Sequence, residues 1–218
     1  MQAIYISVGV LILLIIAGFG LMRWQQQQAV TAAYATPTPA PVPTVKPIAL
    51  ADGDALGKPY FTANPPDTAQ GGRGNDVDGI SCSTQEYVTL HVHTHLAIFY
   101  NGTQLQVPQF IGAANSPAGE CLYWVHTHHP DGIIHVEAPQ LNPPQGGDFT
   151  LGILFDIWGQ PLTRDNVAGL KGPVVAYVNG TKYDGDLRAI PLKSHQQIVL
   201  EIGSPTVTPP NYEFPPAD

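Results

Sequence analysis

The chain has 218 residues, which is enough for a membrane segment, a linker and one folded domain of about 140 residues. Its formal net charge is −8 at pH 7, and all of it falls on residues 71–218, where six basic residues stand against fourteen acidic ones. A surface of this sign disfavours binding to nucleic acid and to anionic lipid, and it raises the local concentration of cations.

The first predicted element is a transmembrane helix at residues 4–22, an apolar run without a charged side chain. A helix of this length, rising about 1.5 Å per residue, spans a hydrocarbon core of about 30 Å. A cleaved signal peptide ending at Ala33-Tyr34-Ala35 is the alternative, but the run is long for such a peptide and the site lies far downstream. Arg23 favours a cytoplasmic domain. The linker and a pair of cysteines favour an extracytoplasmic one, which we expect.

Residues 23–74 predict a linker, because they are rich in Pro, Thr, Ala and Gly and place prolines at alternate positions from 37 to 43. This composition favours extended polyproline II structure and cannot bury a core. The tail at residues 204–218 is also rich in proline, which disfavours regular structure. The folded domain is therefore expected at residues 75–203.

The domain is expected to be mainly β, an antiparallel sandwich or barrel-like arrangement of hairpins with one short helix. Strand patterns at 87–100 and 103–107 are joined by Asn101-Gly102, and those at 174–178 and 181–183 by Asn179-Gly180. Asn-Gly is typical of tight hairpin turns. A last strand is predicted at 196–202. Residues 148–158 predict a helix packed on the sheet with Asp148 as its N-cap, although they also alternate like a strand.

Seven of the eight histidines lie between positions 91 and 135. In the strand at 87–100, alternate side chains share a face, so His91, His93 and His95 are expected on one side. The apolar residues between and after them would face the core on the other side. This strand is therefore expected to present its histidines on one face and the apolar side chains that pack in the core on the other.

The second histidine group is predicted to lie in a hairpin around the turn Pro130-Asp131-Gly132. Pairing residue 128 with residue 133 places His126 opposite His135. It also places Trp124 opposite Glu137. Apolar or small side chains alternate with the polar ones on both strands, as a half-buried antiparallel pair requires. One face of the hairpin then carries His126, His128, His135 and Glu137.

Histidine pairs on one strand with a third histidine on the neighbouring strand are typical of tetrahedral metal sites. Glu137 is either a further ligand or an acceptor that orients an imidazole N–H. Asp131 is assigned to the turn, and His129 and His195 are interpreted as ordinary core or surface histidines. The predicted metal ligands are therefore drawn from His91, His93, His95, His126, His128, His135 and Glu137.

Sulfur ligands are not expected in this site. The only methionines, Met1 and Met22, lie outside the domain, and Cys82 and Cys121 predict a disulfide. The closed loop would contribute about 4 kcal/mol in the chain-entropy model and draw the two histidine groups together. Without sulfur, Cu(I) and blue-copper sites are disfavoured, whereas imidazole with carboxylate suits Zn²⁺, Cu²⁺, Ni²⁺ or Fe²⁺. We expect copper or zinc.

Four motifs resemble those of an uncharacterised family of membrane-anchored bacterial and archaeal proteins: H-x-H-L at 93–96, H-T-H-x-x-x-G-x-I-H-x-E at 126–137, F-T-L-G-x-x-F-D-x-W-G at 149–159 and V-N-G at 178–180. The resemblance implies a shared site and supplies no mechanism. His91-Val92-His93 is similar to the first metal-binding strand of copper/zinc superoxide dismutases, but that family's bridging histidine and catalytic-loop arginine have no evident counterpart. The H-x-H pattern also resembles the cupin motif, which requires a glutamate about four residues later. Positions 97–99 hold alanine, isoleucine and phenylalanine, so this ligand is missing.

The leading hypothesis is an extracytoplasmic, membrane-tethered protein that binds copper or zinc for sequestration or delivery. The alternative is a metalloenzyme, a zinc hydrolase or hydratase or a copper oxidoreductase, which needs an open coordination position and a nearby general base. In a third interpretation the metal is a structural staple. No nucleophile elbow, phosphate-binding loop or dinucleotide fingerprint occurs in the sequence. Catalysis by a serine nucleophile and nucleotide-dependent chemistry therefore have no support.

Overall fold

The computed structural model describes residues 21–22, 46–51, 53–63 and 71–216, and this part of the chain is mainly β with one α-helix. Residues 45–218 form one compact unit. The predicted membrane helix at 4–22 lies outside the described residues except for Leu21 and Met22. Among the residues that are described, no helix is both long enough and apolar enough to cross a bilayer.

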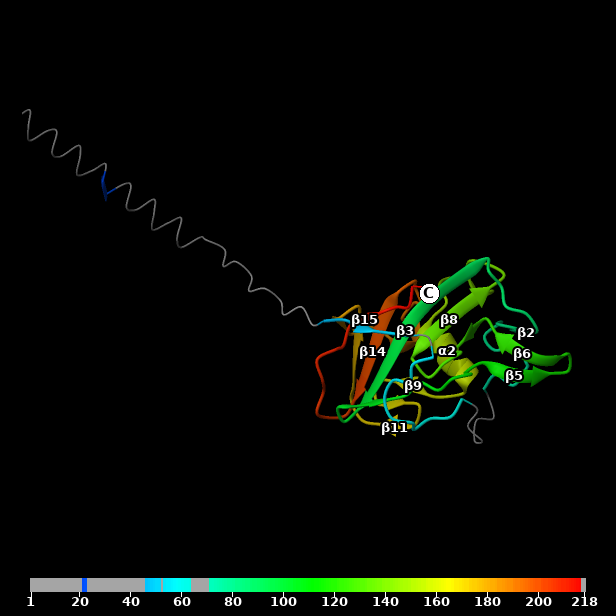
Figure 1. Cartoon of the computed structure of the whole chain (residues 1–218), viewed down its shortest axis with the longest axis horizontal. Helices are drawn as coiled ribbons and strands as arrows, with labels where there is room; N and C mark the ends of the chain where they lie inside the picture. Colours follow the sequence, from blue (N-terminus) through cyan, green and yellow to red (C-terminus); the bar gives the residue numbers. More distant parts are fainter. Residues whose placement is uncertain (1–20, 23–45, 52, 64–70, 217–218) are drawn as a thin grey trace, which may run out of the picture. The chain divides into compact units, whose positions relative to one another are not determined.

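The main sheet has seven strands in the order β13-β12-β14-β3-β8-β7, with β4 also paired to β3. Neighbours are antiparallel except for the parallel pair of β14 and β3, which lie side by side in Figure 1. The strand bounds are Leu90–Tyr100 (β3), Thr103–Leu105 (β4), Val125–His126 (β7), Ile133–Ala138 (β8), Val174–Val178 (β12), Thr181–Tyr183 (β13) and Gln196–Ile202 (β14).

All three predicted hairpins are present in this sheet, as the pairs β3–β4, β7–β8 and β12–β13. In the first and the third, the Asn-Gly turn has two successive residues with positive φ. Asn101 and Gly102 have φ of 47° and 76°, and Asn179 and Gly180 have φ of 49° and 74°. Such turns match the twist of the flanking strands, and Asn and Gly tolerate this backbone best.

Besides the main sheet, the described residues form two three-stranded sheets, one of which contains the disulfide. The strands Cys82–Ser83 (β2), Ala113–Ser116 (β5) and Gly119–Tyr123 (β6) pair in the order β2-β6-β5. The disulfide between Cys82 and Cys121 is confirmed, with the two Cα atoms 5.4 Å apart. The other sheet consists of Leu162–Thr163 (β9), Asn166–Val167 (β10) and Leu170–Lys171 (β11). Closure of these sheets into a sandwich or barrel stays a prediction.

The helix α2 (Leu151–Trp158) packs in the main core on one face of the sheet, together with the side chains of Leu96, Ile98 and Ile134. The predicted helix is confirmed, but Asp148 as its N-cap is wrong. Thr150 occupies that position and makes no capping hydrogen bond with its side chain. Instead, the Leu151 N–H donates to the carbonyl of Ile190 at 2.8 Å, so a neighbouring segment satisfies a donor that a side-chain cap would otherwise serve.

The opposite face of the sheet is partly covered by both ends of the described domain. Strand β1 (Ile48–Ala49) pairs in parallel with β15 (Tyr212–Glu213), and Leu50 and Tyr212 are buried against Phe99. The Gln197 side chain holds this segment by donating to the Tyr212 carbonyl and accepting from its N–H. Part of the expected linker therefore lies on the domain, and the expected lack of regular structure in the tail does not hold at Tyr212–Glu213.

Candidate metal centre

The face of the sheet that carries Phe99 also carries the histidines of β3 and β8, because alternate side chains of a strand point to the same side. Strands β3 and β8 place His91 opposite Glu137 and His93 opposite His135. The pairing of β7 with β8 places His126 opposite His135, which is the register predicted from the turn. The Glu137 N–H also donates to the Trp124 carbonyl at 2.8 Å, as that register requires. Three adjacent strands thus present their polar side chains on one surface.

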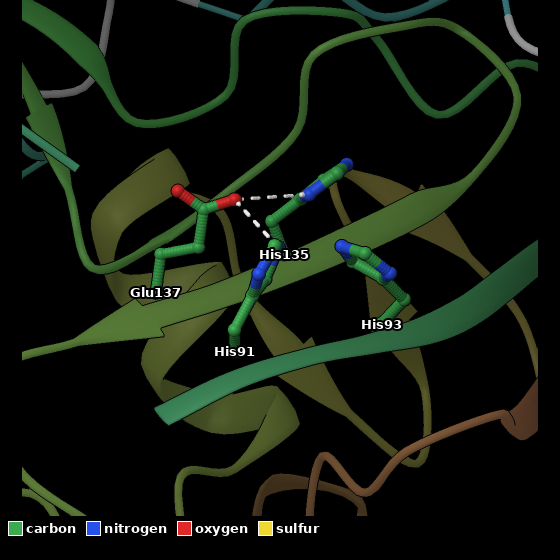
Figure 2. Close-up of side chains that lie close together, drawn as sticks. All are labelled: His91, His93, His135 and Glu137. Atoms are coloured by element: carbon green, nitrogen blue, oxygen red, sulfur yellow. Dashed lines mark ion pairs between the residues drawn. The ribbon is translucent and has the colours of Figure 1, made fainter. Parts of the chain in front are cut away.

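A first group able to hold a metal ion consists of His91, His93, His135 and Glu137 (Figure 2), whose candidate ligand atoms lie within 4.8 Å of one another. Glu137 Oε1 is 3.3 Å from both His91 Nε2 and His135 Nδ1. The group is partly open to solvent, since the side chain of His91 is 45% exposed and that of Glu137 is 7% exposed. The largely buried carboxylate of Glu137 thus faces two imidazole nitrogens.

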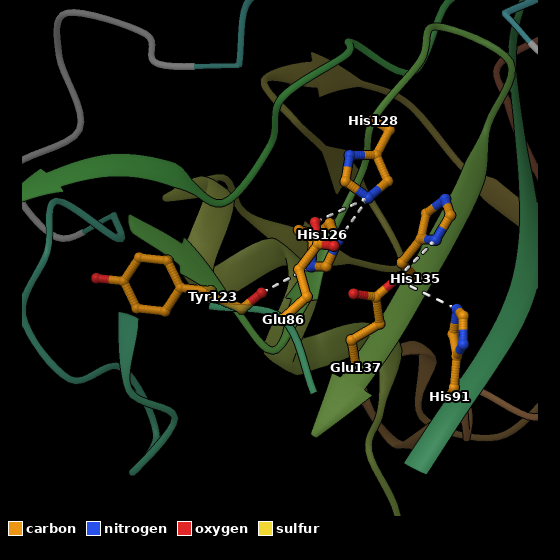
Figure 3. Close-up of polar contacts among 7 residues, drawn as sticks. All are labelled: Glu86, His91, Tyr123, His126, His128, His135 and Glu137. Carbon is orange, nitrogen blue, oxygen red and sulfur yellow. Dashed lines mark hydrogen bonds and ion pairs between the residues drawn. The ribbon is translucent and has the colours of Figure 1, made fainter. Parts of the chain in front are cut away.

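A second group consists of His126, His128, His135 and Glu137 (Figure 3), again with candidate ligand atoms within 4.8 Å. His126 Nδ1 lies 2.7 Å from the carbonyl oxygen of Tyr123. Because a carbonyl only accepts, Nδ1 carries the proton and Nε2 keeps its lone pair for a ligand. That Nε2 lies 3.1 Å from His128 Nε2. Without a metal, the His128 Nε2–H donates a hydrogen bond to His126 Nε2. A bound ion would take the place of the proton between these two nitrogens.

The spacing of these atoms fits a tetrahedral ion. Bonds of about 2.0–2.1 Å at tetrahedral angles hold ligand atoms about 3.3–3.4 Å apart. The separation is 3.1 Å between His126 and His128 and 3.3 Å in the two contacts of Glu137. These three contacts already have the separation of neighbouring ligands, and the remaining ligand atoms of each group lie within 4.8 Å of one another, so they would move closer together around an ion.

The surroundings of His126, His128 and Glu137 favour their ligating protonation states near neutral pH. Burial, with a smaller effect of the neighbouring His128 and His135, lowers the pKa of His126 to about 3 against the opposing effects of Glu137 and of the hydrogen bond to Tyr123. The pKa of His128 is also lowered, mainly by burial. Burial alone would raise the pKa of Glu137, but its contact with His135 and the nearby histidines outweigh that effect and lower it. Neutral imidazoles beside an ionised carboxylate are what a divalent ion binds.

His95 is the one predicted ligand that the structure places outside both groups. Its Nε2 lies 2.9 Å from the carbonyl of Asp131, and its ring packs on Tyr212 with centroids 3.9 Å apart. Burial lowers its pKa to about 4, against an opposing effect of that hydrogen bond. His95 thus has the surroundings of a core histidine, because the C-terminal segment covers this part of the face. Asp131 is a turn residue, as predicted, and accepts from the N–H of Ile133.

Glu86 is a site residue that the sequence analysis missed. Its Oε1 lies 3.5 Å from His128 Nε2 at the edge of the second group (Figure 3). A cavity of about 790 Å³ opens at this edge and is lined by Glu86, Glu120, Phe110 and His128 among others. Glu86 belongs to no strand pattern, so the only available signal was its place between Cys82 and His91, which the disulfide brings towards the second group.

Comparisons with protein-family models, with curated proteins and with solved structures find no significant match for this chain. The functional interpretation therefore depends on the geometry of the site.

Proposed function

We propose that this chain is a transition-metal-binding protein whose ligands are drawn from the two groups described above: His91, His93, His126, His128, His135 and Glu137. One observation carries the proposal: the imidazole and carboxylate atoms of each group lie within 4.8 Å of one another, and three of their contacts, at 3.1–3.3 Å, are close to the ligand separations in a tetrahedral site. The fixed tautomer of His126 supports it, because a hydrogen bond from Nδ1 to a backbone carbonyl is the usual way of orienting a histidine ligand.

The ion is proposed to be copper or zinc, since the ligands are nitrogen and oxygen and the two cysteines are joined to each other. The disulfide also supports an oxidising compartment, so we place the domain on the extracytoplasmic side of a membrane, tethered by the apolar segment at 4–22. A protein of this kind would sequester or deliver the metal outside the membrane. This location and role are tested by protease protection in intact cells and by metal sensitivity of a deletion strain.

Elemental analysis of the full chain tests the metal binding. The protein is purified in detergent from its native host, without chelator or His-tag, beside His126→Ala and His195→Ala. His195 is exposed and lies outside both groups, so its variant is the matched control. We expect one equivalent or more of copper or zinc per chain in the wild type and in the control, and a lower content in His126→Ala. Metal-free wild-type protein that takes up no added ion would contradict the proposal.

A metalloenzyme is the second candidate, and the cavity at the second group favours it. An enzyme needs a space for substrate next to an ion with an open position. The cavity of about 790 Å³ reaches His128 and Glu86, whereas the first group does not line it. Glu86 would be a general base in such an enzyme, because its side chain is 53% exposed and lies beside a candidate ligand. Retention of the fold after chelation would separate both candidates from a purely structural metal.

A further inference from the structure

The two groups of potential ligands overlap without coinciding. His135 and Glu137 belong to both, whereas His91 and His93 belong only to the first group and His126 and His128 only to the second. One tetrahedral ion uses four ligands. An ion in either group would therefore leave two histidines of the other group next to it, with their ligand atoms already gathered.

Glu137 lies between the two sets of exclusive ligands. Its Oε1 faces His91 Nε2 and His135 Nδ1, each at 3.3 Å. Its other oxygen is directed away from His91 (Figure 3). A carboxylate has two oxygens with several lone pairs, so it can bind one ion through each. The contact of His135 with Oε1 assigns this histidine to the same ion as His91.

We propose that the centre is dinuclear, with the Glu137 carboxylate bridging two transition-metal ions. His91, His93, His135 and Glu137 Oε1 surround the first ion, which has four protein ligands. The second ion has only His126, His128 and the other Glu137 oxygen, which leaves a coordination position for water or a small anion. The inference rests on the proposed metal binding and adds a second ion and an open position to it.

The surroundings of the second group suit an ion with an open position. The adjoining cavity reaches His128, so a small molecule has access. Glu86, at 3.5 Å from His128 Nε2, contributes a second negative charge next to a centre that has only one bridging carboxylate. His126 is 1% exposed and would bind the ion from the buried side. His128 is partly exposed and lines the cavity, so it would bind the ion from the solvent side.

Metal stoichiometry tests the number of ions. Chelator-treated full chain is titrated in detergent with Cu²⁺ and with Zn²⁺, and bound metal is counted by calorimetry and elemental analysis. We expect two equivalents in the wild type and in the His195→Ala control. His91→Ala and His128→Ala should each bind one equivalent. Both replaced side chains are partly exposed, at 45% and 31%, so these variants are expected to keep the fold, which circular dichroism checks.

Spectroscopy of the copper-loaded proteins tests the bridge and the open position. Two Cu²⁺ ions in a bridged site lie about 3.5–4 Å apart and couple magnetically, so the wild type should show a broadened or diminished electron paramagnetic resonance signal. The two single-ion variants and Glu137→Gln should show only the spectrum of isolated ions. Added azide should give a charge-transfer band in His91→Ala, which keeps the second ion, and little or none in His128→Ala, which keeps the first.

Two results would overturn the dinuclear centre while leaving the metal-binding function intact. One is a single equivalent in the wild type that is lost in both His91→Ala and His128→Ala, because it would mean that one ion uses all the ligands. The other is two equivalents without magnetic coupling. A wild type that binds no metal would refute the proposed function itself, so the two failures are distinguishable.

Discussion

The histidines of β3 are either metal ligands or core residues, and the structure assigns His95 to the core. The variant His95→Gln tests this assignment. Glutamine keeps an N–H that can donate to the Asp131 carbonyl, which His95 Nε2 approaches to 2.9 Å, but it does not titrate. If His95 is a core residue, the variant binds as much metal at neutral pH as the wild type. It should also change how the stability of the metal-free protein depends on pH.

The magnitude follows from the lowered pKa of His95. Its pKa is 6.5 in an unperturbed chain and about 4 in the folded protein. As the pH falls below 6.5, the unfolded chain therefore takes up a proton here before the folded protein does. The contribution of neutral His95 to stability is complete above pH 6.5 and is lost as the pH falls to about 4. At about 1.4 kcal/mol for each pH unit in this window, the loss amounts to about 3 kcal/mol.

Urea unfolding of the metal-free chain, followed by tryptophan fluorescence, measures this difference. Between about pH 7 and about pH 4.5, which covers most of this window, the free energy of unfolding of the wild type should fall by about 2.4 kcal/mol more than that of His95→Gln. His126, whose pKa is lowered to about 3, titrates in both proteins and cancels in the comparison. Equal pH dependence in the two proteins, or a lost equivalent of metal in the variant at neutral pH, would refute the assignment of His95 to the core.

Three further predictions concern other parts of the domain. Replacing both Cys82 and Cys121 by serine opens a loop with a sequence separation of 39 and should lower the free energy of unfolding by about 4 kcal/mol in urea titrations; a change below about 1 kcal/mol would contradict this. Glu86→Gln should weaken binding of the second ion about tenfold without unfolding the protein, as measured by calorimetry. The matched control is Glu120→Gln, because Glu120 is another exposed glutamate of the same cavity. Gly132→Ala should lower the melting temperature markedly, because φ is 87° and the new Cβ would lie 2.4 Å from the Leu96 carbonyl oxygen; an unchanged melting temperature would show that the turn relaxes.

The register of the histidine hairpin could be predicted because its determinants are local. The turn around Asp131 and Gly132 leaves one pairing of β7 with β8 that keeps the apolar side chains on one face, and a slip by one residue would bury the polar set instead. That pairing places His126 opposite His135 in the structure. The Asn-Gly turns, the disulfide and the helix at 151–158 were predictable for similar reasons of backbone preference, compartment and periodicity.

The placement of His95 and Glu86 could not be predicted, because segments distant in the sequence decide it. Alternation along β3 gives His91, His93 and His95 the same face, yet Tyr212 of the C-terminal segment packs on His95, whereas His91 and His93 belong to the first group. Glu86 reaches His128 across a separation of 42 positions, in a loop without periodic pattern. Local patterns in the sequence determine which side of a strand a side chain takes, whereas burial and convergence depend on which other segments pack against that side, and those contacts exist only in the tertiary structure.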